Sequence, residues 1–291
     1  MKKWPEQRIQ EVADGIFTIV HGQGEVGVAN ANFIIKGKQA IVIDTMTFPE
    51  MTANMVRAIA LHGAHVESVI NTHHHIDHMG GNGLFAGAQI LAHPESLRAV
   101  QRLGFPTHIY DRLMPQFRGY FDGLELTLPT PMRETPTLPY AGELHIFTSA
   151  HTAADISAWF PESRVLLTGD LCFIGVVPLS VNGLISGWLE ALDSLIALDP
   201  AIVVPGHGQV GTKADLVRLR AYFSEVQRIG RSAVAEQMSL EDALAIFDPG
   251  PYDSWIEAKR HIINIERVMQ EERGAISRAD LSTMPPSAQK P

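Results

Sequence analysis

A short stretch at residues 72–81 holds the side chains best suited to chemistry. Its four histidines and one aspartate are His73, His74, His75, Asp77 and His78. Imidazole and carboxylate groups are the protein ligands that suit zinc and its neighbouring metals. A buried polar side chain without a partner costs free energy, so five of them together are not ordinary core residues. We therefore predict a metal site here, rather than a solvated histidine-rich loop.

The elements around this stretch predict that it lies at the carboxyl end of a strand. An apolar run over residues 66–70 predicts a buried strand, and residues 82–86, after Gly80 and Gly81, can open a helix. Open α/β sheets bind their ligands at such strand-to-helix turns. The position therefore favours a functional role for the stretch.

The chain is long enough to fold around a substantial core. It has 291 residues, of which 45% are hydrophobic, which suits one domain or two closely joined halves. No apolar run is long enough to cross a bilayer. The charged amino terminus has no apolar segment behind it, so we expect no secretory signal. Because Cys172 is the only cysteine, no internal disulfide bond can form, and we predict a cytoplasmic protein with no membrane partner.

The charge balance disfavours one class of partner. The net charge is −9, from 32 acidic and 23 basic residues, and the basic residues form no cluster. Nucleic-acid binding depends on clustered Lys and Arg. We therefore expect a small-molecule substrate and no nucleic acid, and the sequence leaves a homo-oligomer open.

Apolar periodicity predicts strands and helices along most of the chain. In the first half the expected strands are 15–20, 32–36, 40–44 and 89–92, and the expected helices are 49–61 and 94–103. In the second half the expected strands are 143–148, 156–160, 164–167 and 202–204, and the expected helices are 188–198, 212–229, 239–247 and 253–272. The carboxyl-terminal end is rich in Pro, Ser and Gln, and we predict a disordered tail over residues 276–291.

The spacing His-x-His-x-Asp-His over residues 73–78 resembles the signature of the metallo-β-lactamase superfamily. On that resemblance His73 and His75 hold one metal ion, and Asp77 and His78 hold a second. His74 is then the variable intervening residue. The superfamily needs three further ligands downstream, each at the end of a strand.

Three later motifs resemble those missing ligands. They are Ser149-Ala150-His151-Thr152, Thr168-Gly169-Asp170 and Pro205-Gly206-His207-Gly208. By resemblance His151 completes the first metal site, His207 completes the second, and Asp170 bridges the two ions. The predicted metal ligands are therefore His73, His75, Asp77, His78, His151, Asp170 and His207. Asp44, at the end of an apolar strand, is expected to be structural or to orient a ligand from behind.

The resemblance also implies the architecture. The expected fold class is α+β, an αββα four-layer sandwich of two mixed β-sheets flanked by helices, with the metals in the cleft between the sheets. It implies a single domain over residues 1–275, built of halves at about 1–130 and 140–230. C-terminal helices are expected over about 231–275.

The ligand set predicts a hydrolytic mechanism. Two divalent ions that share Asp170 can bridge one water molecule and lower its pKa towards about 7. The hydroxide would attack a carbonyl-type carbon, with Asp77 and Asp170 as the catalytic carboxylates. We expect two zinc ions per chain, although the same ligands can hold iron or manganese. The predicted function is hydrolysis of a small thioester, ester or lactone.

Three alternatives remain beside this function. β-Lactam hydrolysis ranks second, an iron-dependent oxidoreductase of the same fold third, and a non-catalytic scaffold is disfavoured by the complete ligand set. By resemblance, acyl-homoserine lactonases carry a tyrosine at the position of Phe173 and many β-lactamases a lysine, whereas glyoxalase II thioesterases tolerate phenylalanine there. Basic residues that would bind glutathione are not evident, and Cys172 is expected to be a packing residue.

The aromatic residues between 105 and 140 have two interpretations. They form a helix packed on the core, or they form a lid that lines the pocket with apolar groups. A lid would imply a substrate with an apolar portion. The candidate pocket residues are Phe48, Tyr110, Phe117 and Phe173.

Overall fold

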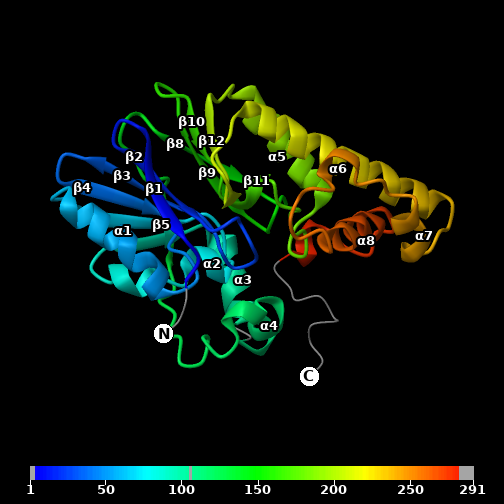
Figure 1. Ribbon diagram of the computed structural model, residues 1–291, viewed down its shortest axis with the longest axis horizontal. Coiled ribbons are helices and arrows are strands. Elements are labelled where there is room, and N and C mark those ends of the chain that lie inside the picture. The colour runs from blue at the N-terminus through cyan, green and yellow to red at the C-terminus, as the bar shows by residue number, and fades with distance from the viewer. Residues whose placement is uncertain (1–3, 105–106, 282–291) are drawn as a thin grey trace.

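Two β-sheets lie face to face in the centre of the molecule, and helices cover both outer faces (Figure 1). The computed structural model describes residues 4–104 and 107–281. Helix α1 (Pro49–Leu61) packs on one side, and α5 (Ile185–Ala197), α6 (Lys213–Ala235) and α8 (Arg260–Glu272) pack on the other.

The first sheet comes from the amino-terminal half and has seven strands in sequence order. The strands are β1 (Gln7–Ala13), β2 (Ile16–His21), β3 (Ala31–Lys36), β4 (Gln39–Ile43), β5 (His65–Asn71), β6 (Gln89–Ala92) and β7 (Thr130–Pro131). Strands β1 to β4 pair in antiparallel fashion, and β4 to β7 pair in parallel. Lys36 pairs with Gln39 across the two-residue turn between β3 and β4, where Gly37 has a φ of +64° that suits glycine.

The second sheet comes from the carboxyl-terminal half and has the order β12-β10-β9-β8. Its strands are β8 (Glu143–Phe147), β9 (Asp155–Phe160), β10 (Val165–Leu167) and β12 (Ile202–Val204). A separate parallel pair consists of β11 (Phe173–Ile174) and β13 (His207–Gly208). Because β9 is antiparallel to both β8 and β10, and β10 is parallel to β12, the strands β8, β10 and β12 all end at the same edge.

Side chains of successive strand residues point to opposite faces of each sheet, and they divide the hydrophobic core into three layers. Ile34 and Ile70 of the first sheet pack against Ile156 and Val204 of the second. The neighbouring residues on each strand point to the opposite faces and meet the helices, as the period-two geometry of strands requires. Helix, sheet, sheet and helix therefore form four layers, and the predicted α+β sandwich is confirmed.

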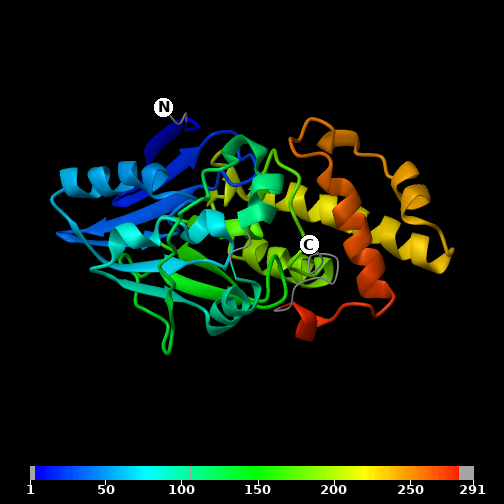
Figure 2. The same ribbon diagram turned by 90° about the horizontal axis from the view of Figure 1, so that it is seen from below.

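Shorter helices complete the chain. They are α2 (Ile76–Met79), α3 (Pro94–Leu103), α4 (Thr107–Leu113) and α7 (Leu240–Ala245), with 3₁₀ turns at Asn82–Phe85, Pro115–Phe117, Gly169–Leu171, Gly250–Tyr252 and Arg278–Asp280. Helix α6 runs away from the sheets and α8 packs across it, as both views show (Figures 1 and 2). No helix in the described part of the chain is long and apolar enough to span a membrane.

One predicted helix begins later than expected. The apolar pattern indicated a helix over 253–272, but α8 begins at Arg260. The preceding segment is used for pairing, because Ile256 forms a parallel bridge with Val176. Its amide donates to the carbonyl of Gly175, and the amide of Val177 donates to its carbonyl. These contacts hold Ile256 as a bridge between turns at 253–254 and 258–259 and fix residues 175–177 against the start of α8.

The predicted disordered tail over 276–291 is wrong for its first part. Ser277 and Asp280 form a capping box around a 3₁₀ turn, and Leu281 is only 1% exposed, against Ala153 and Leu184. A leucine that packs in this way orders the segment before it. The remainder of the predicted tail, 282–291, lies outside the described residues.

We expect Leu281→Ala to lower the free energy of unfolding by about 2–3 kcal/mol, because the change removes apolar burial and leaves a cavity. Chemical denaturation would measure it. Leu61→Ala is the matched control, since Leu61 is 89% exposed and its truncation should change stability by less than about 0.5 kcal/mol. Equal stabilities for the two variants would contradict the packing of residues 276–281.

Candidate metal centre

Four chain segments bring the candidate ligands to one edge of the sandwich. Residues 73–78 follow β5, and His151 follows β8. Asp170 lies in the 3₁₀ turn after β10, and His207 begins β13 just after β12. Strands that run in the same direction end at the same edge, so side chains far apart in sequence meet there.

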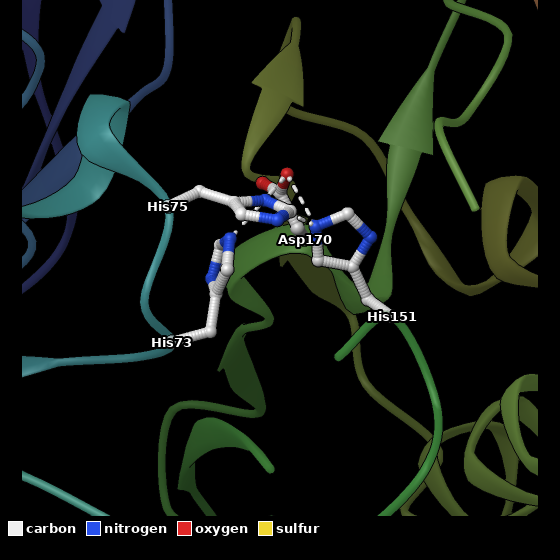
Figure 3. A group of neighbouring side chains, drawn as sticks. All are labelled: His73, His75, His151 and Asp170. Atoms are coloured by element: carbon white, nitrogen blue, oxygen red, sulfur yellow. Dashed lines mark hydrogen bonds and ion pairs between the residues drawn. The ribbon is translucent and has the colours of Figure 1, made fainter. Parts of the chain in front are cut away.

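The first group consists of His73, His75, His151 and Asp170 (Figure 3). Each offers one ligand atom, and these atoms all lie within 4.8 Å of one another. His151 Nε2 is 3.0 Å from His75 Nδ1 and 3.3 Å from Asp170 Oδ2. His73 Nε2 lies 3.9 Å from the same carboxylate oxygen.

The second group consists of Asp77, His78 and His207. His207 Nε2 lies 3.3 Å from Asp77 Oδ2. The carboxylate of Asp170 also borders this group, since its Oδ1 is 3.0 Å from His78 Nε2 and its Oδ2 is 3.5 Å from His207 Nε2. Asp170 therefore lies between the two groups, and the structure brings together all seven predicted ligand residues.

Hydrogen bonds behind the imidazoles leave one ring nitrogen of each free to face the centre. His75 Nε2 lies 3.0 Å from Asn182 Oδ1, and His78 Nδ1 lies 2.7 Å from Asp44 Oδ2. His207 Nδ1 lies 3.2 Å from the carbonyl oxygen of Gly24. These three oxygens can only accept, so the ring nitrogen next to each oxygen carries a proton. The opposite nitrogens, His75 Nδ1, His78 Nε2 and His207 Nε2, point to the centre and could each offer a lone pair to a metal ion.

Asp44 is buried behind the centre and orients His78. It also accepts hydrogen bonds from the amide and the hydroxyl of Thr72, both at 2.8 Å. Its φ of +66° is unusual for a residue other than glycine. The three hydrogen bonds of the Asp44 carboxylate hold the residue in this backbone conformation, which is unfavourable by itself.

The orphaned atoms of the two groups fit divalent cations. His73 Nε2, His78 Nε2 and Asp170 Oδ1 are buried and meet no hydrogen-bond criterion within the described residues, although the last two lie 3.0 Å apart as an ion pair. Buried polar atoms of this kind cost free energy unless another group satisfies them. Metal–ligand bonds of about 2.1 Å at tetrahedral angles separate ligand atoms by about 3.4 Å. The distances of 3.0–3.9 Å found within the two groups match that spacing.

Charges within the centre balance one another strongly. Burial alone would lower the pKa of His207, but Asp170 and Asp77 raise it to about 9. Burial acts to raise the pKa of Asp170, but His78 and His207 hold it well below its usual value. A divalent cation would take over this compensation and release protons from the imidazoles.

Gly206 allows the chain to pass close to Asp170. A Cβ atom at this position would lie 1.9 Å from Asp170 Oδ1, which is far shorter than the contact distance of two non-bonded atoms. The amide of Gly206 donates to the carbonyl of Gly169 at 2.8 Å and so ties the two ligand loops together. Only glycine permits this approach.

A cavity of about 430 Å³ opens beside the candidate ligands. Its walls are mainly apolar and come from α3, α4 and the loop at 176–182, and include Val100, Leu103, Leu113, Met114, Leu179 and Val181. Small-molecule sites have this size and this mixture of apolar walls with few polar groups.

Two of the four predicted pocket residues line this cavity and two do not. Tyr110 and Phe173 are in its wall. The predictions for Phe48 and Phe117 are corrected, because both are only 1% exposed and pack edge to face at 5.4 Å behind the wall. The region 105–140 thus combines both interpretations, since α4 lines the cavity while Phe117 and Phe121 anchor the segment to the core. Residues 105–106 lie outside the described residues.

Four polar residues of the cavity, His74, Arg112, Asn182 and Arg260, were not predicted from the sequence, whereas Cys172 lies where it was expected. Asn182 and Arg260 line the cavity, but their loop and helix give no local signal of it. His74 also lines it, with both ring nitrogens buried and without a hydrogen-bond partner in the described chain. Cys172 is fully buried in the core of the second half, as expected of a packing residue.

Comparison with known proteins gives one family and several distant relatives. The family model of the metallo-beta-lactamase superfamily matches residues 24–207. A 2,4-dinitroanisole O-demethylase subunit alpha of Nocardioides sp. (strain JS1661) is 28% identical over 209 residues, which cover 69% of this chain and 55% of the relative. A hydroxyacylglutathione hydrolase of Synechococcus sp. (strain JA-3-3Ab) is 30% identical over 164 residues, covering 56% of this chain and 55% of the relative. The chain thus spans little more than half the length of these two relatives.

Solved structures share the fold at low sequence identity. The sec-alkyl sulfatase PisA1, as a double mutant, superposes with a TM-score of 0.72 at 18% identity, over 96% of this chain and 52% of that chain. The DIM-1 metallo-beta-lactamase superposes with a TM-score of 0.58 at 21% identity, over 76% of this chain and 99% of that chain. At these identities the structures support the fold alone.

We expect Gly206→Ala to lower the metal content of the purified protein, because the added Cβ would displace the carboxylate of Asp170. Elemental analysis by mass spectrometry would measure the metal. Gly87→Ala is the matched control, since a Cβ there meets no atom within 4 Å. Full metal content in Gly206→Ala would show that Asp170 can move without loss of binding.

Proposed function

The chain belongs to the metallo-β-lactamase superfamily, and from that membership we propose that it is a dinuclear zinc hydrolase of small thioesters, esters or lactones. One observation supports the dinuclear centre more than any other. The carboxylate of Asp170 lies within 3.0–3.5 Å of ring nitrogens from both ligand groups, as a bridging ligand must.

The chain's residues divide the remaining tasks. When bound, divalent ions lower the pKa of a coordinated water towards about 7 and polarise a carbonyl oxygen. His73, His75 and His151 would hold one ion, and Asp77, His78 and His207 the other. Asn182 and Asp44 fix the rings of His75 and His78. The mixture of imidazole and carboxylate ligands supports zinc as the metal, and iron and manganese accept the same ligands.

Tyr110 supplies a neutral hydrogen-bond donor beside the centre. Burial, and then the nearby charge of Asp77, raise the pKa of its hydroxyl. The hydroxyl therefore stays protonated at neutral pH and can donate to an oxyanion that develops on the substrate. This donor comes from α4. Phe173 occupies the position at which, by the resemblance, lactonases carry a tyrosine and many β-lactamases a lysine.

The choice of acyl substrates rests on relatives and on the cavity. A second hydroxyacylglutathione hydrolase, from Brucella anthropi, is 24% identical over 79% of this chain and 83% of its own length. Both hydrolases bear a name that denotes an acyl-glutathione substrate. The residues that line the described cavity include the cations Arg112 and Arg260 but no lysine, whereas many superfamily β-lactamases bind the substrate's carboxylate with a lysine. β-Lactam hydrolysis is therefore the second choice.

A hydrolysis panel with and without a chelator tests the proposal. It would compare a hydroxyacyl-glutathione thioester, an acyl-homoserine lactone, an aryl ester, a β-lactam and 2,4-dinitroanisole. We expect one of the first three to be turned over fastest, and the chelator to abolish turnover. Fastest turnover of the β-lactam or of dinitroanisole would change the substrate class, and the absence of chelator-sensitive turnover would contradict a metal hydrolase.

We expect Asp77→Ala and His151→Ala to lower kcat/KM by more than the roughly 10- to 100-fold that changes behind a metal ligand cost, because each removes a ligand. Steady-state kinetics on the best substrate of the panel would measure the loss, with circular dichroism to verify folding. Cys172→Ser serves as the control and should keep both metal content and activity. Retained activity in the two ligand variants would overturn the assignment.

A further inference from the structure

Arg260 is a buried cation in the cavity wall that the proposed chemistry does not use. It is the first residue of α8 and only 7% exposed, and it lies 53 residues beyond the end of the family match at 207. We propose that Arg260 binds an anionic group of the substrate, so that the preferred substrates are amphiphilic anions. The proposal rests on the hydrolase function and adds the substrate's charge to it.

Within residues 4–104 and 107–281, the guanidinium of Arg260 has more N–H donors than its hydrogen bonds satisfy. Nη1 donates to the carbonyl of Val177 at 3.0 Å. Nη2 lies 3.9 Å from Glu257 Oε1, which is too long for a hydrogen bond, and that oxygen already accepts from the amide of Val26 at 3.1 Å. A guanidinium has five N–H donors in a planar fork that matches carboxylate, sulfate or phosphate. The side chain therefore has donors available for a ligand in the cavity that it lines.

The charges around the cavity favour an anion once the centre holds metal. Asp77 and Asp170 are the acidic residues among those that line it. Two divalent ions would bring four positive charges against these two negative ones. Arg260 in the wall and the exposed Arg112 at the mouth add further positive charge. An anionic substrate would complement this excess, and steering by Arg112 would aid its approach.

The apolar walls define the rest of the ligand. The loop that Arg260 contacts also presents Leu179 and Val181 to the cavity, and Leu113 at the end of α4 and the following Met114 line it as well. A volume of about 430 Å³ suits a chain or ring of moderate size. The structure thus points to an oxyanion head joined to an apolar body near the scissile bond.

A purely structural role for Arg260 is the competing explanation, and the chain offers a matched control for it. Three residues on one face of α8 donate to carbonyl oxygens of the loop: Arg260 to Val177, Asn264 to Pro178 at 3.0 Å, and Arg267 to Gly183 at 2.6 Å. Arg267 is as buried as Arg260, at 6% exposed, but it is not among the cavity-lining residues. Both arginines therefore donate a hydrogen bond from α8 to a loop carbonyl, and we call this set of bonds the clamp. They differ because only Arg260 lines the cavity where the ligand would bind.

Calorimetric titration of the metal-loaded protein tests the proposal without turnover. The probes are octanoate, octyl sulfate and uncharged 1-octanol, so the two anions distinguish a carboxylate head from a tetrahedral one. We expect one anion to bind more tightly than octanol. Arg260→Gln should weaken the binding of that anion by about 10- to 100-fold, the range for hydrogen bonds to charged groups. The affinity for octanol should not change. Arg267→Gln should lower the melting temperature yet keep the anion preference.

Equal anion binding by Arg260→Gln and the unchanged protein would overturn the proposal. An equal loss in Arg260→Gln and Arg267→Gln would also overturn it, because the clamp alone would then explain the effect. If Arg260→Gln does not fold, Arg260→Lys decides instead, since it keeps the charge but loses the planar fork. It should bind the anion several-fold more weakly, and unchanged binding would contradict the proposal.

A kinetic comparison separates this proposal from the hydrolase function. Arg260→Gln should lower kcat/KM for the hemisuccinate ester of 4-nitrophenol, which is anionic, and not for the neutral butyrate ester. No hydrolysis of any ester by the unchanged protein would count against the hydrolase function, while the titration would still decide the role of Arg260.

Discussion

The burial of the Asp170 carboxylate among five histidines is the constraint on which the rest of the structure depends. Its oxygens lie 3.0–3.9 Å from ring nitrogens of His73, His78, His151 and His207, and the group is 4% exposed. Isolated charges are costly to bury, so this cluster is stable only if opposite charges and hydrogen bonds surround it completely. Imidazolium protons can do so, but divalent cations satisfy the orphaned nitrogens and oxygens as well.

The fold meets this requirement by fixing each ligand from behind. Strand ends from both sheets converge at one edge, Gly206 lets two ligand loops touch, and Asp44, Asn182 and the carbonyl of Gly24 orient three of the rings. Asn182 itself belongs to the loop whose carbonyl oxygens accept hydrogen bonds from side chains of α8. Helices far from the ligands in sequence therefore help to set the geometry of the centre, which is how partners behind metal ligands act in general.

The layered fold and the clustering of the candidate ligands could be predicted from the sequence because their signals are local. Each candidate ligand follows an apolar strand, and the spacing within 73–78 is compact. Asn182 escaped notice because its contact with His75 spans 107 positions, and Arg260 because a lone arginine at a helix start resembles any surface residue. Phe48 and Phe117 were assigned to the pocket because aromatic residues suit both a wall and the core, and only tertiary packing separates the two. The late start of α8 has a similar cause, since pairing of Ile256 with Val176 overrides helical periodicity.

Native mass spectrometry of the protein after exchange into zinc-containing buffer tests the central claim most directly. The account predicts a mass that corresponds to two zinc ions per chain, with Asp170→Asn retaining fewer because the ligand between the groups loses its charge. A saturated protein that holds a single ion, or an Asp170→Asn variant that still holds two, would contradict a dinuclear centre bridged by Asp170.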